Sequence, residues 1–119
     1  MIYLWIGLGS ALGGMARYAC QVWAVRAIGD TFPWGTLIVN IVGCILIGFI
    51  ATFTDRGIHR QFLMVGICGG YTTFSSFSLE TLNLARDGQW SRAAVYVVGS
   101  VVLCFVAVLL GHIAATALK

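Results

Sequence analysis

The chain has 119 residues, of which 60% are hydrophobic and only 9% are charged, and its mean hydropathy is +0.94. Soluble domains carry about a quarter charged residues, so this composition indicates a protein that lies in a lipid bilayer. The net charge is +3, and the connectors between the apolar segments are too short for a soluble nucleotide-binding domain, so we expect neither nucleotide nor nucleic acid as a partner.

Four apolar segments each approach the ~20 residues that a helix needs to cross the hydrocarbon core. They are residues 2–25, 36–53, 62–82 and 93–118, with connectors near 26–33, 54–61 and 83–92. The second segment is the shortest, and we expect its helix to begin near Trp34. The first is too long for a signal peptide and should remain as a helix. The sequence predicts an all-α membrane protein with four transmembrane helices in a single domain, residues 1–119.

The cationic residues are divided evenly between the two membrane sides that four spans define. One side has Arg56, Arg60 and Lys119, and the other has Arg26, Arg86 and Arg92. An excess of Lys and Arg on one side is what sets the orientation of a membrane protein. Without it, we expect the chain to insert both ways and to pair as an antiparallel dual-topology homodimer. The alternative is one fixed orientation set by another feature.

In the first segment, small and polar residues recur at helical spacing. These residues are Gly7, Ser10, Gly14, Arg17 and Gln21. Two G-x-x-x-G pairs, Gly9 with Gly13 here and Gly66 with Gly70 in the third segment, are typical of close helix packing in membranes. Arg17 has two interpretations that stay open: it attracts anions into an aqueous vestibule, or it anchors the helix by reaching the interface.

The second segment repeats this pattern with Thr36, Asn40, Cys44 and Gly48. Asn40 is the notable member, because an amide at membrane depth is expensive and usually faces a partner or a water-filled cavity. Its side chain offers two N–H donors. We therefore expect Asn40 to have a functional role.

The third segment contains residues 69–78, Gly-Gly-Tyr-Thr-Thr-Phe-Ser-Ser-Phe-Ser, which place five Ser or Thr hydroxyls in an apolar stretch. In hydrocarbon, irregular or hydroxyl-rich backbone is tolerated only where it is packed in protein or lines a polar path. A broken helix at membrane depth therefore marks an ion or substrate site. This segment predicts a transport protein.

If the third helix unwinds near residues 69–72, the freed carbonyl groups can bind a hard cation such as Na⁺. When the helix resumes, Phe74 and Phe77 share one face at i and i+3, beside a line formed by Thr73, Ser76 and Glu80. A phenyl ring has a positive edge, so two rings with hydroxyl and amide donors nearby can carry a small anion without holding it tightly. The alternative is that both rings only fill space against lipid or core.

The fourth segment carries Tyr96, Ser100 and Cys104 at helical spacing, and His112 near its end. His112 is either a proton site or a histidine satisfied by a neighbour. The four cysteines have no C-x-x-C spacing and are expected to be small buried hydrophobic residues; they are Cys20, Cys44, Cys68 and Cys104. We find no paired metal ligands and no nucleophile–base pairing, so we do not expect an enzyme.

Residues 66–80, GICGGYTTFSSFSLE, resemble the signature of the Fluc (CrcB-type) fluoride channels. Two further matches are GGMARY at 13–18 and PWGTLIVNIVG at 33–43. Together with the length and the number of spans, the resemblance covers essentially the whole chain. The third-segment motif is the distinctive part.

The resemblance implies a dual-topology homodimer with two antiparallel fluoride pores and one central structural Na⁺. It implies that Phe74, Phe77 and Asn40 line the pore and that Gly69 and Thr72 supply carbonyl ligands to Na⁺. It also implies a polar track formed by Thr73, Ser76, Tyr96 and Ser100, with Arg17 near the vestibule. Cys104 stands where we would expect a further hydroxyl, so the far end of the track departs from the family pattern.

These expectations describe a passive fluoride channel in a bacterial inner membrane. The inside-negative potential contributes about 2.3 kcal/mol per charge per 100 mV to anion exit, which can hold internal fluoride about fiftyfold below equality. One alternative is a small dual-topology proton-coupled multidrug exporter, which would need a carboxylate in its first helix, where this chain has Arg17. Another is a non-transporting packing subunit, which would explain the glycines but not the hydroxyl and phenylalanine cluster.

Overall fold

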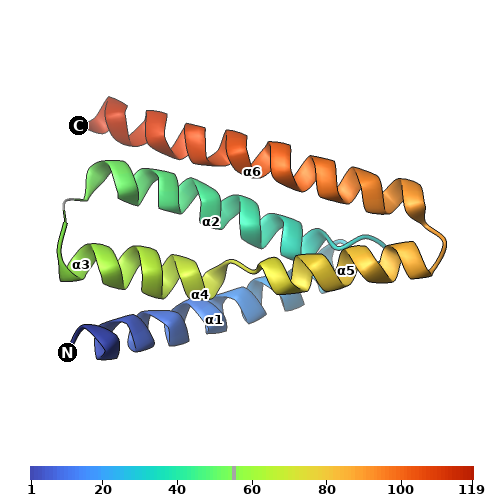
Figure 1. The fold of residues 1–119 in the computed structure, drawn as a ribbon, viewed down its shortest axis with the longest axis horizontal. Helices are drawn as coiled ribbons and strands as arrows, with labels where there is room; N and C mark the ends of the chain where they lie inside the picture. Colours follow the sequence, from blue (N-terminus) through green and yellow to red (C-terminus); the bar gives the residue numbers. More distant parts are fainter. Residues whose placement is uncertain (55) are drawn as a thin grey trace.

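The computed structural model describes residues 1–54 and 56–119, and within these ranges it is helical without strands. The elements in chain order are α1 (Ile2–Ala27), α2 (Trp34–Phe53), α3 (Ile58–Arg60), the π-helix η1 (Gln61–Cys68), α4 (Gly69–Tyr71), α5 (Phe74–Arg86) and α6 (Trp90–Leu118). Figure 1 shows the long helices roughly aligned, with both termini at one end. The all-α prediction is confirmed, and α2 begins at Trp34 as expected. Asp55, in the predicted connector 54–61, lies outside the described residues.

Within residues 1–54 and 56–119, three stretches are long and apolar enough to cross a membrane: Trp34–Phe53, Ile58–Arg86 and Trp90–Leu118, with mean hydropathies of 2.4, 1.3 and 2.7. The helix α1 has 26 residues, which is sufficient length for a crossing, but it is not among these apolar candidates. The protein is therefore an all-α chain with three apolar candidate spans. A fourth span at α1 stays a prediction.

The stretch Ile58–Arg86, which contains the third apolar segment of the sequence, is broken as predicted, but the break lies two residues later than the centre of the expected range. Thr72 and Thr73 are extended, with φ/ψ of −81°/156° and −147°/120°, whereas the glycines of α4 remain helical. A Cβ atom at Gly70 would lie 2.6 Å from the Ser10 carbonyl oxygen, so this glycine allows helices to approach closely rather than unwinding the chain. The predicted unwinding near residues 69–72 therefore occurs at Thr72 but not at Gly69 and Gly70, which remain helical.

The helix α1 runs alongside η1 and α4, which are its main neighbours. A Cβ at Gly9 would lie 2.7 Å from the Phe62 carbonyl oxygen, and one at Gly13 would clash with the carbonyl oxygen of Ile67. Both G-x-x-x-G pairs therefore lie at a close backbone contact, which confirms their predicted role in packing.

The helices α2 and α6 run parallel and form the most extensive contact in the structure (Figure 1). Gly48 packs against Val108, and Thr52 Oγ1 lies 2.7 Å from His112 Nδ1, so residues 60 apart in sequence lie at the same level. His112 thus has a hydrogen-bonding neighbour, as one interpretation of this residue expected. The same register places Asn40 and Ser100 at one level of the bundle.

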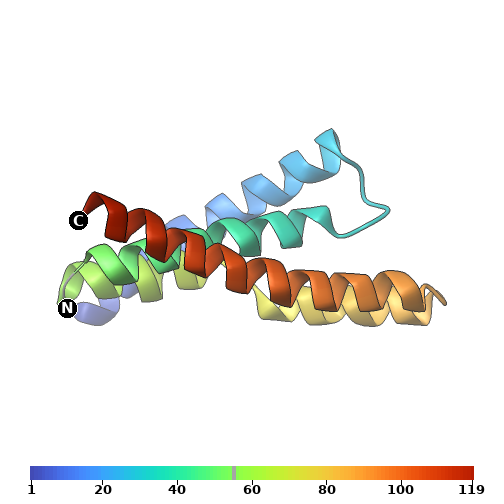
Figure 2. The same ribbon diagram turned by 90° about the horizontal axis from the view of Figure 1, so that it is seen from above.

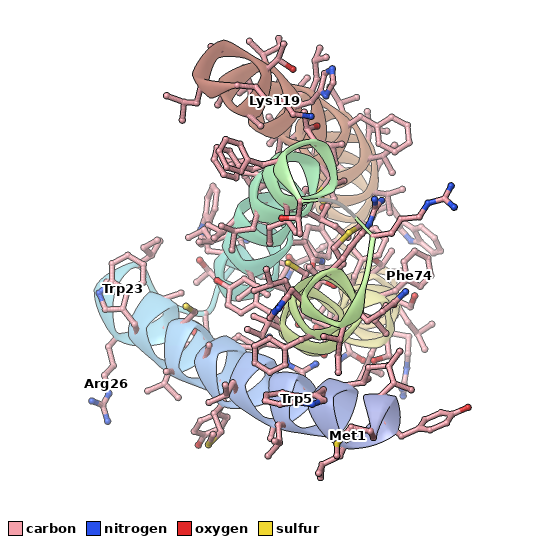
Figure 3. All side chains as sticks on the ribbon, turned by 90° about the vertical axis from the view of Figure 1, so that its left-hand side faces the viewer. Met1, Trp5, Trp23, Arg26, Phe74 and Lys119 are labelled. Atoms are coloured by element: carbon pink, nitrogen blue, oxygen red, sulfur yellow. The ribbon has the colours of Figure 1, made fainter. Side chains whose placement is uncertain are left out.

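The C-terminal end of α1 diverges from α6, and a connector joins it to the start of α2 (Figure 2). Figure 3 shows Trp23 and Arg26 on this diverging end. A cavity of about 600 Å³ lies here, lined by the end of α1, the start of α2 and one side of α5. At the same end, Gly88 adopts φ +77° in the turn from α5 to α6, a conformation that favours glycine.

Candidate functional site

Asn40 binds the backbone at the break in the third helix. Its Oδ1 accepts the Thr73 N–H at 2.9 Å, and its Nδ2 donates to the Thr73 carbonyl oxygen at 3.0 Å. One side chain therefore satisfies both peptide groups of a residue that has left the helical ladder, as buried backbone requires. We expected a functional role for Asn40 because its side chain offers two N–H donors, and one of these donors binds the Thr73 carbonyl. The second N–H of the Asn40 amide does not bind Thr73.

Thr73 also begins α5 as its N-cap residue. Its Oγ1 accepts the Ser76 N–H at 3.2 Å and lies 3.3 Å from Ser75 Oγ, and the side chain is buried. A threonine that accepts from the third residue of the helix is a favoured N-cap. Thr73 therefore fixes the direction in which Phe74 and Phe77 leave the break.

These hydrogen bonds remove the helical donors from two carbonyl groups. In a continuous α-helix the Thr73 N–H would bind the Gly69 carbonyl and the Ser76 N–H would bind the Thr72 carbonyl. Here the two N–H groups donate to Asn40 and to Thr73 Oγ1. Carbonyl oxygens without helical donors are the kind of group that binds a hard cation such as Na⁺, and the assignment of Gly69 and Thr72 as its ligands stays a prediction.

The two phenylalanines of α5 contact each other, with ring centroids 5.5 Å apart and planes at 58°. Phe77 is half-buried and also contacts Tyr96, with ring centroids 5.0 Å apart. Phe74 is 78% exposed and projects away from the bundle (Figure 3). The structure therefore brings Phe74, Phe77 and Tyr96 into one aromatic row that extends from the core to the surface of the single chain.

A polar network that the sequence analysis did not identify joins four helices. Thr36 Oγ1 donates to Glu80 Oε1 at 2.6 Å, the Tyr96 hydroxyl donates to Glu80 Oε2 at 2.9 Å, and Gln21 Nε2 donates to Thr36 Oγ1 at 3.2 Å. We call these four residues the Glu80 network. Its signal in the sequence is a carboxylate in the third apolar segment together with polar residues in the other three, since a carboxylate in an apolar segment requires donors from other helices.

Ser100 lies one turn beyond Tyr96 on α6 and is buried. Its Oγ has no hydrogen-bond partner within residues 1–54 and 56–119. Buried hydroxyl groups are nearly always paired, so an unpaired one requires an explanation. Because Ser100 lies at the level of Asn40, this free hydroxyl is close along the bundle axis to the helix break.

The predicted site residues thus form two neighbouring groups. Gly69, Thr72, Thr73 and Asn40 lie at the break, while Ser76 lines the cavity together with Gln21, Thr36 and Glu80. Asp30 and Asp87 also line this cavity. Arg17 is half-buried on α1 and is not among the cavity-lining residues; its place near a vestibule stays a prediction.

These features define a multi-pass α-helical membrane protein whose third helix is broken at a polar site. The chain belongs to the CrcB family: the family model described as "CrcB-like protein, Camphor Resistance (CrcB)" matches residues 4–112. This assignment confirms the resemblance found in the sequence.

Curated relatives are similar over nearly their whole lengths. A protein of Opitutus terrae named "Fluoride-specific ion channel FluC" is 56% identical over 99% of this chain and 95% of its own. Proteins of the same name from Paramagnetospirillum magneticum and Rhodospirillum rubrum are 52% and 53% identical, over 98% and 97% of this chain and 96% and 95% of their own.

Proposed function

We propose that this protein is a fluoride-selective channel through which fluoride leaves the cytoplasm passively, across a bacterial inner membrane. Family membership and relatives named as fluoride-specific channels support the proposal. In the structure, the observation that carries it is the buried hydroxyl of Ser100, which has no hydrogen-bond partner among the described residues. The proposal assigns no catalysed reaction to the chain, and membership of this family gives no support to the multidrug-exporter alternative.

Fluoride is a small anion, so it leaves water only where donors replace part of its hydration shell. Ser100 supplies a hydroxyl that no described residue uses, and Asn40 keeps one N–H after binding Thr73. The ring edges of Phe74 and Phe77 supply weaker positive charge. Several weak contacts in series suit conduction, because an ion that binds too tightly does not leave.

We propose further that α1 is a fourth span and that two chains pair in opposite orientations to form two pores. The exposure of Phe74 in the single chain supports this assembly, because a pore ring should face protein rather than lipid. Gly69 is exposed too. In the proposed dimer, both residues face the partner subunit, and Arg17 lies near an aqueous vestibule.

A structural Na⁺ at the centre of the dimer completes the proposal. The carbonyl groups of Gly69 and Thr72 have lost their helical donors, as described above, and each chain would contribute both. Na⁺ would hold the two broken helices together by neutralising the partial negative charge of these oxygens.

Fluoride and chloride efflux from liposomes containing purified protein tests the proposal. We expect fast fluoride efflux, no chloride efflux, and a rate lower by about tenfold or more in Ser100→Ala, because hydrogen bonds to charged groups contribute about 1.5–3 kcal/mol. Ser91→Ala makes the same change at an exposed position of α6 and should keep the parental rate. Equal fluoride and chloride efflux, or none from folded protein, would contradict the proposed function.

A further inference from the structure

Gln21 is the member of the Glu80 network that comes from α1. It is half-buried, whereas Thr36 and Tyr96 are 2% and 1% exposed. Gln21 does not reach Glu80 in this network. Its side-chain amide donates to the Thr36 hydroxyl oxygen at 3.2 Å, so any influence on the carboxylate passes through Thr36.

A threonine hydroxyl has one hydrogen, and its direction decides which acceptor it serves. Here the hydrogen points to Glu80 Oε1, at the short distance of 2.6 Å. The amide of Gln21 occupies a lone pair of the same oxygen, which leaves the hydrogen free for Glu80. Hydrogen bonds in such a chain strengthen one another, so Gln21 favours the orientation in which Thr36 donates to the carboxylate.

The position of this carboxylate matters because Glu80 lines the cavity at the end of the bundle. With Thr36 and Tyr96 bound to its two oxygens, Glu80 is fixed between α2 and α6. If one of these bonds were lost, the side chain could turn into the cavity and place a negative charge in the path of an anion.

We infer that Gln21 is a positioning residue for fluoride passage: through Thr36 it holds the Glu80 carboxylate against the cavity wall. The inference rests on the proposed function. It identifies α1 as a contributor to the permeation path through a hydrogen bond, in addition to its packing role at the glycines.

Fluoride efflux from liposomes tests this role. Gln21→Leu should slow efflux by about two- to tenfold, the equivalent of one hydrogen bond. In a Thr36→Val background, the same change should have no further effect, because the connecting hydroxyl is gone. Gln61→Leu is the matched control, since Gln61 is half-buried as Gln21 is and does not line this cavity; we expect parental efflux.

Gln21→Glu gives a second readout that packing alone would not change. When the introduced carboxyl is protonated it can donate to Thr36, and when it is ionised it competes with Glu80 for the Thr36 hydrogen. The efflux rate relative to the parent should therefore fall by about two- to tenfold as the pH is raised through the pKa of the introduced carboxyl. Asp30 and Asp87 line the same cavity, and Arg92 binds the Thr31 carbonyl at its rim; these charges are common to both proteins, so the ratio isolates the new group.

The outcomes separate the two proposals. If the parent passes fluoride but Gln21→Leu passes it equally fast, or the Gln21→Glu ratio does not change with pH, Gln21 has no positioning role. Additive losses in the Gln21→Leu/Thr36→Val pair would likewise overturn it. If the parent itself passes no fluoride, the proposed function fails and this inference fails with it.

Discussion

Replacing Asn40 with leucine should destabilise the protein by about 2–4 kcal/mol. Leucine has a similar size but cannot bind either peptide group of Thr73, which Asn40 contacts at 2.9 and 3.0 Å. Each buried polar group left without a partner costs about 1–3 kcal/mol. Two such groups together would cost about 2–6 kcal/mol. Hydrogen bonds between membrane helices average only about 0.6 kcal/mol, so we expect a loss in the lower part of that range.

The loss can be measured by unfolding purified protein in mixed micelles of increasing denaturing detergent. Asn83→Leu provides the matched control, because it makes the same substitution at an exposed position of α5 and should change stability by less than about 0.5 kcal/mol. Hydrogen exchange adds a local readout: the Thr73 amide should be protected in the parent and exchange quickly in Asn40→Leu.

Equal stability of Asn40→Leu and Asn83→Leu would refute this reasoning. So would a Thr73 amide that stays protected in Asn40→Leu, since another acceptor would then satisfy it. Either result would mean that the break is held by packing rather than by the Asn40 amide.

Three further predictions concern the packing of α1, the two phenylalanine rings and the proposed Na⁺. Gly13→Ala should lower the stability of the bundle by about 1–3 kcal/mol, because its Cβ would clash with the Ile67 carbonyl oxygen. Gly14→Ala is the control, since Gly14 has open space around it, and it should not lower the stability. Equal unfolding midpoints for the two variants would contradict this prediction. Phe74→Ile with Phe77→Ile should abolish fluoride efflux from folded protein if ring edges carry the anion, and retained efflux would reject that role. Exchange of Na⁺ for a large organic cation should reduce fluoride efflux until Na⁺ is restored, and undiminished efflux would argue against the proposed ion.

The long helices and the aromatic pair were predictable because they depend on local pattern. Phe74 and Phe77 are three residues apart, so any helix places them on one face, and their rings are in contact. That Asn40 has a hydrogen-bonding partner was also predictable, since an amide in an apolar helix must find one; its role in a pore stays a prediction. Its actual partner, the backbone of Thr73, is on another helix and could not be identified from spacing.

The position of the break and the Glu80 network depend on how helices are aligned with one another, which one sequence does not contain. Gly69 and Gly70 suggested unwinding by their composition, but contact with Ser10 keeps Gly70 helical. Gln21 and Glu80 come together through Thr36 only because α1 and α5 both pack near the start of α2. Such a register is set by packing between helices.

The most direct test of the account is the reversal potential of single-protein currents in a planar bilayer with fluoride on one side and chloride on the other. We predict currents carried by fluoride alone, with a reversal potential that follows the fluoride gradient and does not move when the chloride concentration is changed. A reversal potential that follows chloride, or the absence of current from protein that is folded and inserted, would contradict the claim that this chain forms a fluoride-selective channel.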